Sequence, residues 1–271
     1  MSEVLLNFVH ISDTHLLYPD ERKDFIGVSP EFAQYAEQVL TQPHHTTTIT
    51  AALAQQINAL PVPVDFVLHT GDVAGESTTD YEHIAGLLGQ IHYPLIYTPG
   101  NHDSLPGMQR VCSQKAPEVC EYEFNGVQIV ALDSSRYGTG HGGRLSADQL
   151  DRLDAICSAA ERPLIVATHH HPMPIDVPWL DELGLVNGAD LHRVLLKARR
   201  RLRGVFIGHI HHSLDIYKDG ILYSSVASAA YQFTAWPGYQ QASLDTLADP
   251  GFNLVTVTFD QTIIRHYRFR V

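Results

Sequence analysis

Residues 95–103 read LIYTPGNHD and join a short apolar run to a glycine and three side chains that bind metals or move protons. The apolar part predicts a buried strand at 94–98. The amide oxygen of Asn101 is a candidate metal ligand. The imidazole of His102 points elsewhere, and we expect Asp103 to orient it. The motif therefore predicts a metal-binding or catalytic site at the end of a strand.

Four other apolar runs lead into groups of the same kind. VLLNFVHIS precedes Asp13-Thr14-His15, DFVLHTGD ends at Asp72, LIVATHHH ends at His169–His171, and GVFIGHIH ends at His209–His211. Carboxylate, amide and imidazole ligands suit Mn²⁺, Zn²⁺ or Fe and not a soft thiolate site. Ligands at the carboxyl ends of neighbouring strands converge on one edge of a sheet. The sequence therefore predicts a two-metal hydrolytic site.

Length and composition are typical of an ordinary soluble globular protein, with 271 residues, 44% of them hydrophobic and 18% charged. No apolar stretch approaches about 18 residues, so we expect no membrane span. The start, MSEVLLNFVHIS, lacks a basic region and runs into a predicted strand, so we read it as structure and not as a signal peptide. Of the three cysteines, Cys112 and Cys120 can pair, but reduced thiols in a cytoplasmic protein are the favoured interpretation.

The net charge of −12 argues against a nucleic-acid polymer as partner, because such binding depends on Lys and Arg at phosphates. The basic run Lys197–Arg203 is interpreted as a solvated helix end, where cations suit the helix dipole, rather than as a phosphate patch.

Strand and helix signals alternate along the chain, and no linker separates them, so we predict a single domain over 1–271. An irregular stretch at 17–46, with a short helix near 30–40, is a candidate lid. Asn125-Gly126 and Asp219-Gly220 predict hairpin turns. The predicted helices are 47–60, 80–91, 105–115, 146–160 and 188–202. The predicted strands include 64–70, 121–124, 127–132, 163–168, 204–208, 253–259 and 262–270.

The order D-x-H, G-D, G-N-H-D, a His run and G-H-x-H, from Asp13 to His211, resembles the calcineurin-like metallophosphoesterases. The resemblance implies an α/β fold, a four-layer α/β/β/α sandwich of two mixed sheets. It also implies a binuclear metal centre at the strand ends, with two divalent or trivalent ions of Mn, Fe or Zn.

The resemblance assigns a role to each position. The metal ligands it implies are Asp13, His15 and His211 for one ion, Asn101, His170 and His209 for the other, and Asp72 as the bridge. Within the His run, alignment on the family's H-H-P-P favours His170, and His169 is the alternative. His102, oriented by Asp103, would face the substrate as the catalytic donor. Two ions about 3.5–4 Å apart can share an attacking hydroxide and hold a phosphoryl group between them.

Differences between this sequence and the motifs of other metallophosphoesterase groups narrow the resemblance to one branch of the superfamily. Gly75 stands where purple acid phosphatases place a metal-binding Tyr, and no Arg follows Asp72 as in protein Ser/Thr phosphatases. The stretches Thr168–Pro174, Trp179–Asn187 and Leu132–Ser134 look like bacterial class III cyclic nucleotide phosphodiesterases. That branch implies a small phosphodiester substrate, foremost 3′,5′-cyclic nucleotides such as cAMP. The alternatives are glycerophosphodiesters and, outside catalysis, a metal-binding interaction scaffold.

Substrate choice and a possible homodimer are expected to depend on the 17–46 stretch and on the tail beyond Tyr231. Trp179, Tyr231 and Trp236 are candidates for stacking a base, although we expect buried packing for each. His141, in the glycine-rich stretch 137–143, is a weaker candidate for contact with the substrate.

Overall fold

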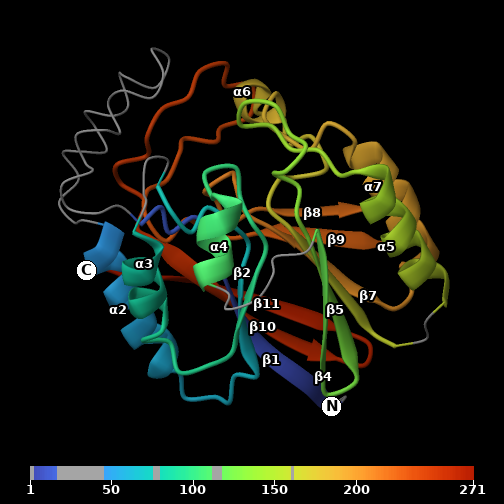
Figure 1. Ribbon diagram of the computed structural model, residues 1–271, viewed down its shortest axis with the longest axis horizontal. Coiled ribbons are helices and arrows are strands. Elements are labelled where there is room, and N and C mark those ends of the chain that lie inside the picture. The colour runs from blue at the N-terminus through green and yellow to red at the C-terminus, as the bar shows by residue number, and fades with distance from the viewer. Residues whose placement is uncertain (1–2, 17–45, 76–79, 112–117, 160–161) are drawn as a thin grey trace.

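The computed structural model describes residues 3–16, 46–75, 80–111, 118–159 and 162–271 (Figure 1). The candidate lid lies outside the described residues except for Thr46, as do the helix expected near 30–40 and Cys112. Among the described residues, Cys120 and Cys157 are in no disulfide. No described helix is long and apolar enough to cross a membrane.

The first sheet has five strands in the order β11-β10-β1-β2-β3. Their bounds are β1 Val4–Ile11, β2 Phe66–His69, β3 Leu95–Tyr97, β10 Gly251–Thr258 and β11 Thr262–Arg268. β1, β2 and β3 run parallel, whereas β10 is antiparallel to β1. Every residue of β2 is buried, as expected for a parallel strand covered on both faces.

The second sheet has six strands in the order β4-β5-β6-β7-β9-β8. Their bounds are β4 Val119–Phe124, β5 Val127–Leu132, β6 Leu164–Thr168, β7 Leu202–Ile207, β8 Asp215–Lys218 and β9 Ile221–Ser225. The inner strands β5, β6, β7 and β9 run parallel, and antiparallel β4 and β8 form the edges. Both predicted hairpin turns are confirmed, since Asn125-Gly126 and Asp219-Gly220 join these edges with positive φ at each residue.

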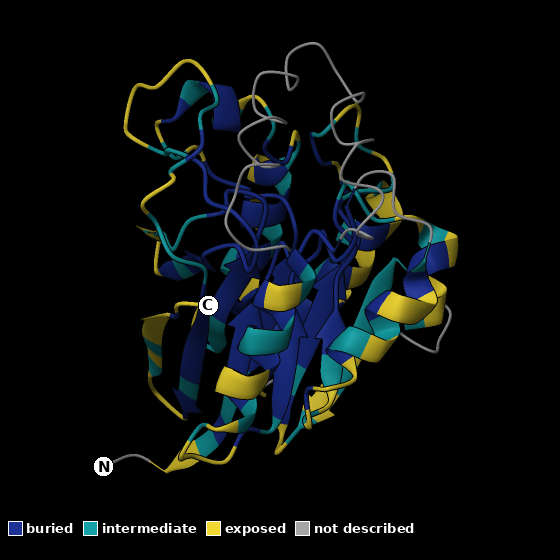
Figure 2. Cartoon of the chain, turned by 90° about the vertical axis from the view of Figure 1, so that its left-hand side faces the viewer, coloured by how far each residue is buried: buried dark blue, intermediate teal, exposed yellow. Residues whose placement is uncertain are grey.

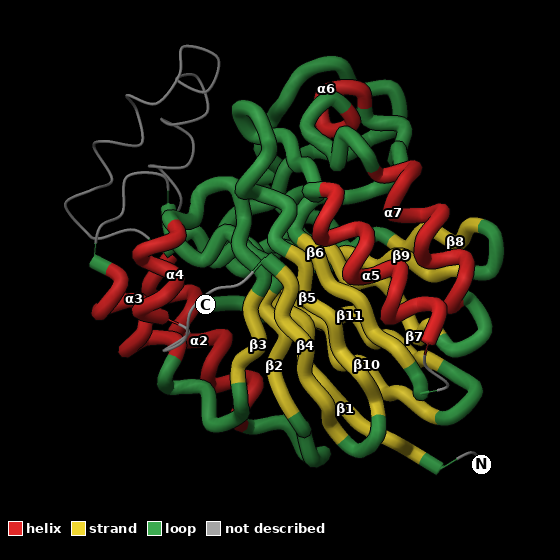
Figure 3. Tube along the Cα trace, turned by 45° about the vertical axis from the view of Figure 1, so that its right-hand side comes forward, coloured by secondary structure: helices red, strands yellow, loops and turns green. Residues whose placement is uncertain are grey.

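Helices cover the outer face of each sheet (Figure 3). One apolar cluster joins the first sheet to α2 Thr46–Asn58, α3 Tyr81–Leu88 and α4 Leu105–Val111. A second joins the six-stranded sheet to α5 Ala147–Ala159 and α7 Gly188–Leu195. A third cluster fills the space between the sheets. The predicted four-layer α/β/β/α sandwich is therefore confirmed.

Two elements differ from the sequence prediction. The helix expected over 188–202 ends at Leu195, and a 3₁₀ turn, η2 Leu196–Ala198, follows it. It is shorter because β7 begins at Leu202, which pairs with Leu164, and the chain must turn before that point. A short helix, α6 Pro178–Asp181, was not predicted.

Aromatic rings lie among aliphatic side chains in the packing between the sheets. The ring of Phe8 stacks on Phe66 with centroids 4.9 Å apart and meets Phe206 of the opposite sheet edge-on at 5.0 Å. Such contacts fix the separation of the two sheets, so the loops after their parallel strands lie together at one end. Figure 2 shows these loops above the buried strands.

Candidate active site and metal centre

The loops after β1 and β2 are joined by backbone hydrogen bonds. The amide of Asp13 donates to the carbonyl of Gly71 at 2.9 Å, and the amide of His15 donates to the carbonyl of Asp72 at 3.0 Å. Gly71 has φ 101°, and a Cβ there would lie 2.6 Å from Nδ1 of His169. Glycine is therefore required for this close approach.

Most of the predicted ligands have a left-handed backbone, which costs a non-glycine residue about 1–2 kcal/mol. The positive φ angles are 54° at Asp13, 40° at His15, 52° at Asp72, 68° at His209 and 54° at His211. All five residues are buried. Strain of this kind persists where the surrounding structure holds it and is concentrated at functional sites.

Asp13, His15 and His211 form one group of candidate ligands. Nε2 of His211 lies 3.1 Å from Nε2 of His15 and 3.4 Å from a carboxylate oxygen of Asp13. Nδ1 of His211 donates to the carbonyl of Tyr231 at 2.7 Å. This hydrogen bond turns Nε2 toward the group, the orientation that a metal-binding imidazole has.

Asp72 lies between two such groups. Its Oδ2 is 3.8 Å from Nε2 of His15 and 3.2 Å from Nε2 of His169, and its Oδ1 accepts the backbone N–H of His102 at 2.9 Å. Burial alone raises the pKa of this carboxyl, but His169 and His102 hold the pKa well below its usual value. The carboxylate is thus ionised and available to both groups.

His169 is held so that one ring nitrogen faces two oxygens. Its Nδ1 donates to the carbonyl of Thr70 at 2.7 Å, which leaves Nε2 3.1 Å from Oδ1 of Asn101 and 3.2 Å from Oδ2 of Asp72. A lone pair facing two acceptors is unfavourable unless a positive charge lies between them. Burial lowers the pKa of His169, yet Asp72 raises it to about 9, so a proton fills the position that a cation would fill.

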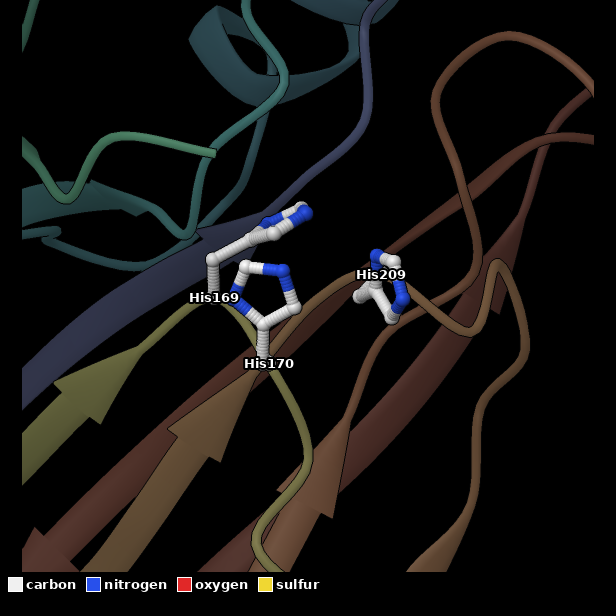
Figure 4. Close-up of side chains that lie close together, drawn as sticks. All are labelled: His169, His170 and His209. Carbon is white, nitrogen blue, oxygen red and sulfur yellow. The ribbon is translucent and has the colours of Figure 1, made fainter. Parts of the chain in front are cut away.

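The ring of His170 lies beside that of His169 (Figure 4), and both of its nitrogens have protein partners. Its Nε2 donates to the carbonyl of His141 at 3.0 Å, and its Nδ1 accepts from the hydroxyl of Ser134 at 2.8 Å. Burial and then His169 lower its pKa well below the usual value, so the ring is neutral. A neutral imidazole has one donor and one acceptor, and both are used here.

His209 completes the second group with His169 and His170, although its ring comes from the loop after β7 (Figure 4). Its backbone N–H donates to both oxygens of Asp13 at 3.2 Å. Its Nε2 is buried and has no hydrogen-bond partner among the described residues. Because buried polar atoms are nearly always partnered, this nitrogen fits an ion at the site.

The side chain of Asp103 accepts hydrogen bonds from two backbone amides. Its Oδ1 accepts the N–H of Ala74 at 3.0 Å and its Oδ2 accepts that of Gly100 at 2.9 Å. Burial and then the charge of Asp72 raise its pKa to about 7. The hydrogen bonds to Ala74 and Gly100 hold the G-N-H-D loop against the loop that carries Asp72.

The ring of His102 stands at the margin of the site with 15% of its side chain exposed. Its Nε2 is 3.9 Å from Oδ2 of Asp72, and the ring packs against His15 and stacks on His141 at centroid distances of 5.0 and 5.2 Å. His102 thus stands at the margin of the cluster, where it forms a further group of candidate ligands with His15 and Asp72.

Several contacts at the site could not be predicted from the sequence. Carbonyl groups such as those of Thr70 and Tyr231 orient ligands, and any residue type supplies a carbonyl. His141, weighed only as a weak candidate, accepts from the amide of Asn101 at Nδ1 over 3.1 Å. Its place in a glycine-rich stretch was the only signal available.

The ligand atoms within each group lie within 4.8 Å of one another, and the groups share Asp13, His15, Asp72 and His169. Two adjoining sets of buried carboxylates and imidazoles, with lone pairs turned inward, are consistent with a binuclear metal site. The donor set is hard or borderline, and no sulfur contributes to it.

A family model described as calcineurin-like phosphoesterase matches residues 6–213. The 3′,5′-cyclic adenosine monophosphate phosphodiesterase CpdA of Escherichia coli K12 is 30% identical over 265 residues, which cover 96% of this chain and 88% of that protein. The protein of the same name from Pseudomonas aeruginosa is 37% identical over 193 residues, covering 70% of this chain and 68% of that protein.

Among solved structures, a dimetal phosphatase from Danio rerio aligns with a TM-score of 0.70 at 14% identity, covering 99% of this chain and 98% of that one. GAP50, the anchor in the inner membrane complex of Plasmodium, aligns with a TM-score of 0.61 at 12% identity, covering 97% and 84%. These likenesses show the fold alone, because fold does not determine activity.

The matched residues include every fragment that supplies the buried ligand cluster, from Asp13 to His211. The chain therefore belongs to the calcineurin-like phosphoesterase family and is a metal-dependent phosphoesterase.

Proposed function

We propose that this enzyme hydrolyses 3′,5′-cyclic nucleotides, with cAMP as the preferred substrate. The observation that carries the proposal is the buried double cluster around Asp72 in a chain that aligns over 96% of its length with a cAMP phosphodiesterase. A second relative, from Nostoc, is a 3′,5′-cyclic-nucleotide phosphodiesterase, 26% identical over 97% of this chain and 92% of that protein.

We assign the ligands from the direction of their lone pairs. One ion would be held by Asp13, His15 and His211, the other by Asn101, His169 and His209, and Asp72 would serve both. His169 is preferred to His170 because its Nε2 faces Asp72 and Asn101, whereas both nitrogens of His170 already have protein partners. Mn, Fe and Zn all suit this donor set.

When bound, the two ions would polarise the phosphoryl oxygens and lower the pKa of the attacking water. In the reaction the water oxygen bonds to phosphorus, the bond from phosphorus to O3′ breaks, and O3′ takes a proton to give the 5′-nucleotide. His102, beside Asp72 and partly exposed, is suited to donate a hydrogen bond or the proton to that oxygen. Asp103 holds the loop that positions it.

The test is a substrate panel with the metal-loaded enzyme, compared by kcat/KM. The panel contains cAMP, cGMP, a 2′,3′-cyclic nucleotide, glycerophosphodiesters and a phosphate monoester. The highest kcat/KM for cAMP supports the proposal, and a higher value for a glycerophosphodiester overturns it in favour of the alternative substrate class. Bis(p-nitrophenyl) phosphate serves as the control for an intact catalytic centre.

A further inference from the structure

The segment after β9 carries two exposed aromatic side chains. Trp236 is 65% exposed and Tyr239 is 44% exposed. The other aromatic candidates for base stacking, Trp179 and Tyr231, are buried at 9% and 6%, as expected for them. The expectation of buried packing is wrong for Trp236. An exposed tryptophan has a large apolar surface that is available to a ligand.

The base of this segment is bound to the metal centre. The carbonyl of Tyr231 accepts from Nδ1 of His211 at 2.7 Å, and the ring of Phe233 lies 4.6 Å from that of His211. The ring of Tyr231 also packs against His15 at 5.1 Å. Trp236 is three residues beyond Phe233, a span of at most about 11 Å of chain. Trp236 is therefore only a short length of chain away from residues that contact the ligand cluster.

The loop above this base is closed and anchored. The amide of Thr234 donates to the carbonyl of Ser243 at 2.7 Å, and Phe233 forms an isolated bridge with Leu244. Phe233 packs edge-on against Trp179 of α6, at 5.1 Å. In Figure 1 the loop is the orange-red segment beside α6, at the end of the molecule to which the parallel strands point.

The two rings stand at the ends of one tight turn, Trp236-Pro237-Gly238-Tyr239, here named the aromatic turn. The amide of Tyr239 donates to the carbonyl of Trp236 at 3.1 Å, and Gly238 has φ 80°. Proline followed by glycine with positive φ defines a type II turn, in which the outer Cα atoms lie within about 7 Å. The amide of Gly238 also donates to the carbonyl of Asp176 at 2.6 Å, which fixes the tip.

We propose that the aromatic turn is a stacking platform for the nucleobase of the substrate. This rests on the proposed cyclic nucleotide substrate, whose phosphate would lie at the metal centre and whose base must extend from it. Exposed rings on a turn that backbone hydrogen bonds already hold can stack on a planar base at reduced entropic cost. Stacking tolerates different bases, since each has an aromatic face.

The first experiment measures binding without turnover. The metal-loaded protein is titrated with AMP and, as the matched ligand without a base, with ribose 5-phosphate. Trp236→Ala is expected to raise the Kd for AMP about fivefold or more relative to that for ribose 5-phosphate, and Trp236→Phe is expected to restore most of the loss. Tyr217→Ala, which removes a 77% exposed ring on β8, is the matched control and leaves both Kd values unchanged.

Fluorescence supplies an independent measurement, because the chain has two tryptophans and Trp179 is buried. AMP is expected to quench the emission of the natural protein and not that of Trp236→Phe, while ribose 5-phosphate quenches neither. Equal AMP affinity in the natural protein and Trp236→Ala overturns the platform. A change in oligomeric state with unchanged AMP affinity also overturns it, and would make the turn a self-association surface.

The two proposals fail separately. Absence of cAMP hydrolysis by the metal-loaded enzyme contradicts the proposed function whatever the AMP titration gives. Hydrolysis of cAMP with the same KM in the natural protein, Trp236→Ala and Tyr239→Ala contradicts the stacking platform alone.

Discussion

Both ends of the parallel strands hold residues with a left-handed backbone, but the two sets differ in burial and only one contains histidines. At the amino-terminal ends of β5 and β9 these are Asn125-Gly126 and Asp219-Gly220, which are exposed. At the carboxyl-terminal ends they are buried aspartates and histidines of the ligand cluster, such as Asp13 and His209. Asparagine, aspartate and glycine are the residues that tolerate this conformation in hairpin turns.

This difference in burial and residue type shows that the two ends of the parallel strands meet different structural requirements. At the hairpins the residues are of types that tolerate the left-handed backbone. At the metal centre the backbone is bent to suit the side chain, and the strain is offset by hydrogen bonds such as those from the amide of His209 to Asp13. Substitutions at the two ends are therefore expected to have unlike effects.

Removal of the shared carboxylate is expected to have the largest effect. Asp72→Ala is predicted to lose both metal equivalents and to lower turnover of bis(p-nitrophenyl) phosphate by about a thousandfold or more. Metal content by mass spectrometry and initial rates measure the two effects. Asp215→Ala, at the distant edge strand β8, is the control and retains both ions. Two ions retained by Asp72→Ala would contradict the shared role.

His102→Ala separates catalysis from metal binding. The variant is predicted to retain both metal equivalents and to lose about 10²–10⁴ in kcat, because it lacks the donor to the leaving oxygen. Metal content and kcat are measured on the same preparation. Loss of a metal ion in this variant would instead place His102 among the ligands.

Two neighbouring histidines test which side chain faces the metal. His169→Ala is predicted to lose one metal equivalent and about 100-fold or more in turnover, since its Nε2 points at Asp72. His170→Ala is predicted to keep both equivalents and to reduce stability instead, by leaving Ser134 without its partner. Calorimetric titration with Mn²⁺ measures the stoichiometry, and the reverse outcome would restore the assignment of His170.

A pair of glycine substitutions gives the smallest effects and compares the two ends directly. Gly126→Ala meets no described atom within 4 Å of the new Cβ, so its predicted cost is about 1 kcal/mol from the backbone alone. Gly71→Ala adds contact with His169, with a predicted cost of about 3 kcal/mol or more. Urea denaturation of the metal-free proteins measures both, and equal costs would contradict the close packing at Gly71.

Much of the fold was predictable because the apolar runs are short and lead directly into polar or glycine-containing motifs. β6 and β2 read as continuous hydrophobic segments, which is the pattern of strands buried on both faces. The ends of helices were less predictable. The helix from Gly188 stops at Leu195 although its sequence continues to favour helix, because strand pairing of Leu202 decides where the chain must turn.

The residue types of the candidate site were predictable from the sequence, but the directions of their side chains were less so. β6 ends at Thr168, so strand alternation no longer dictates which of the following three histidines faces inward. Adjacency alone also did not predict that the oxygens of Asp103 accept from the backbone amides of Ala74 and Gly100. The directions of these side chains depend on the conformation of the loop backbone, which the type of each single residue does not determine.

The length of chain between the ligands limits when a metal ion can be captured during synthesis. His15 and His211 are 196 residues apart, yet their ring nitrogens lie 3.1 Å from each other. β1 is also incomplete until β10, at Gly251–Thr258, pairs with it. The nascent chain must therefore be almost wholly translated before either ion finds its full set of ligands. Metal capture is therefore expected to follow the synthesis of most of the chain.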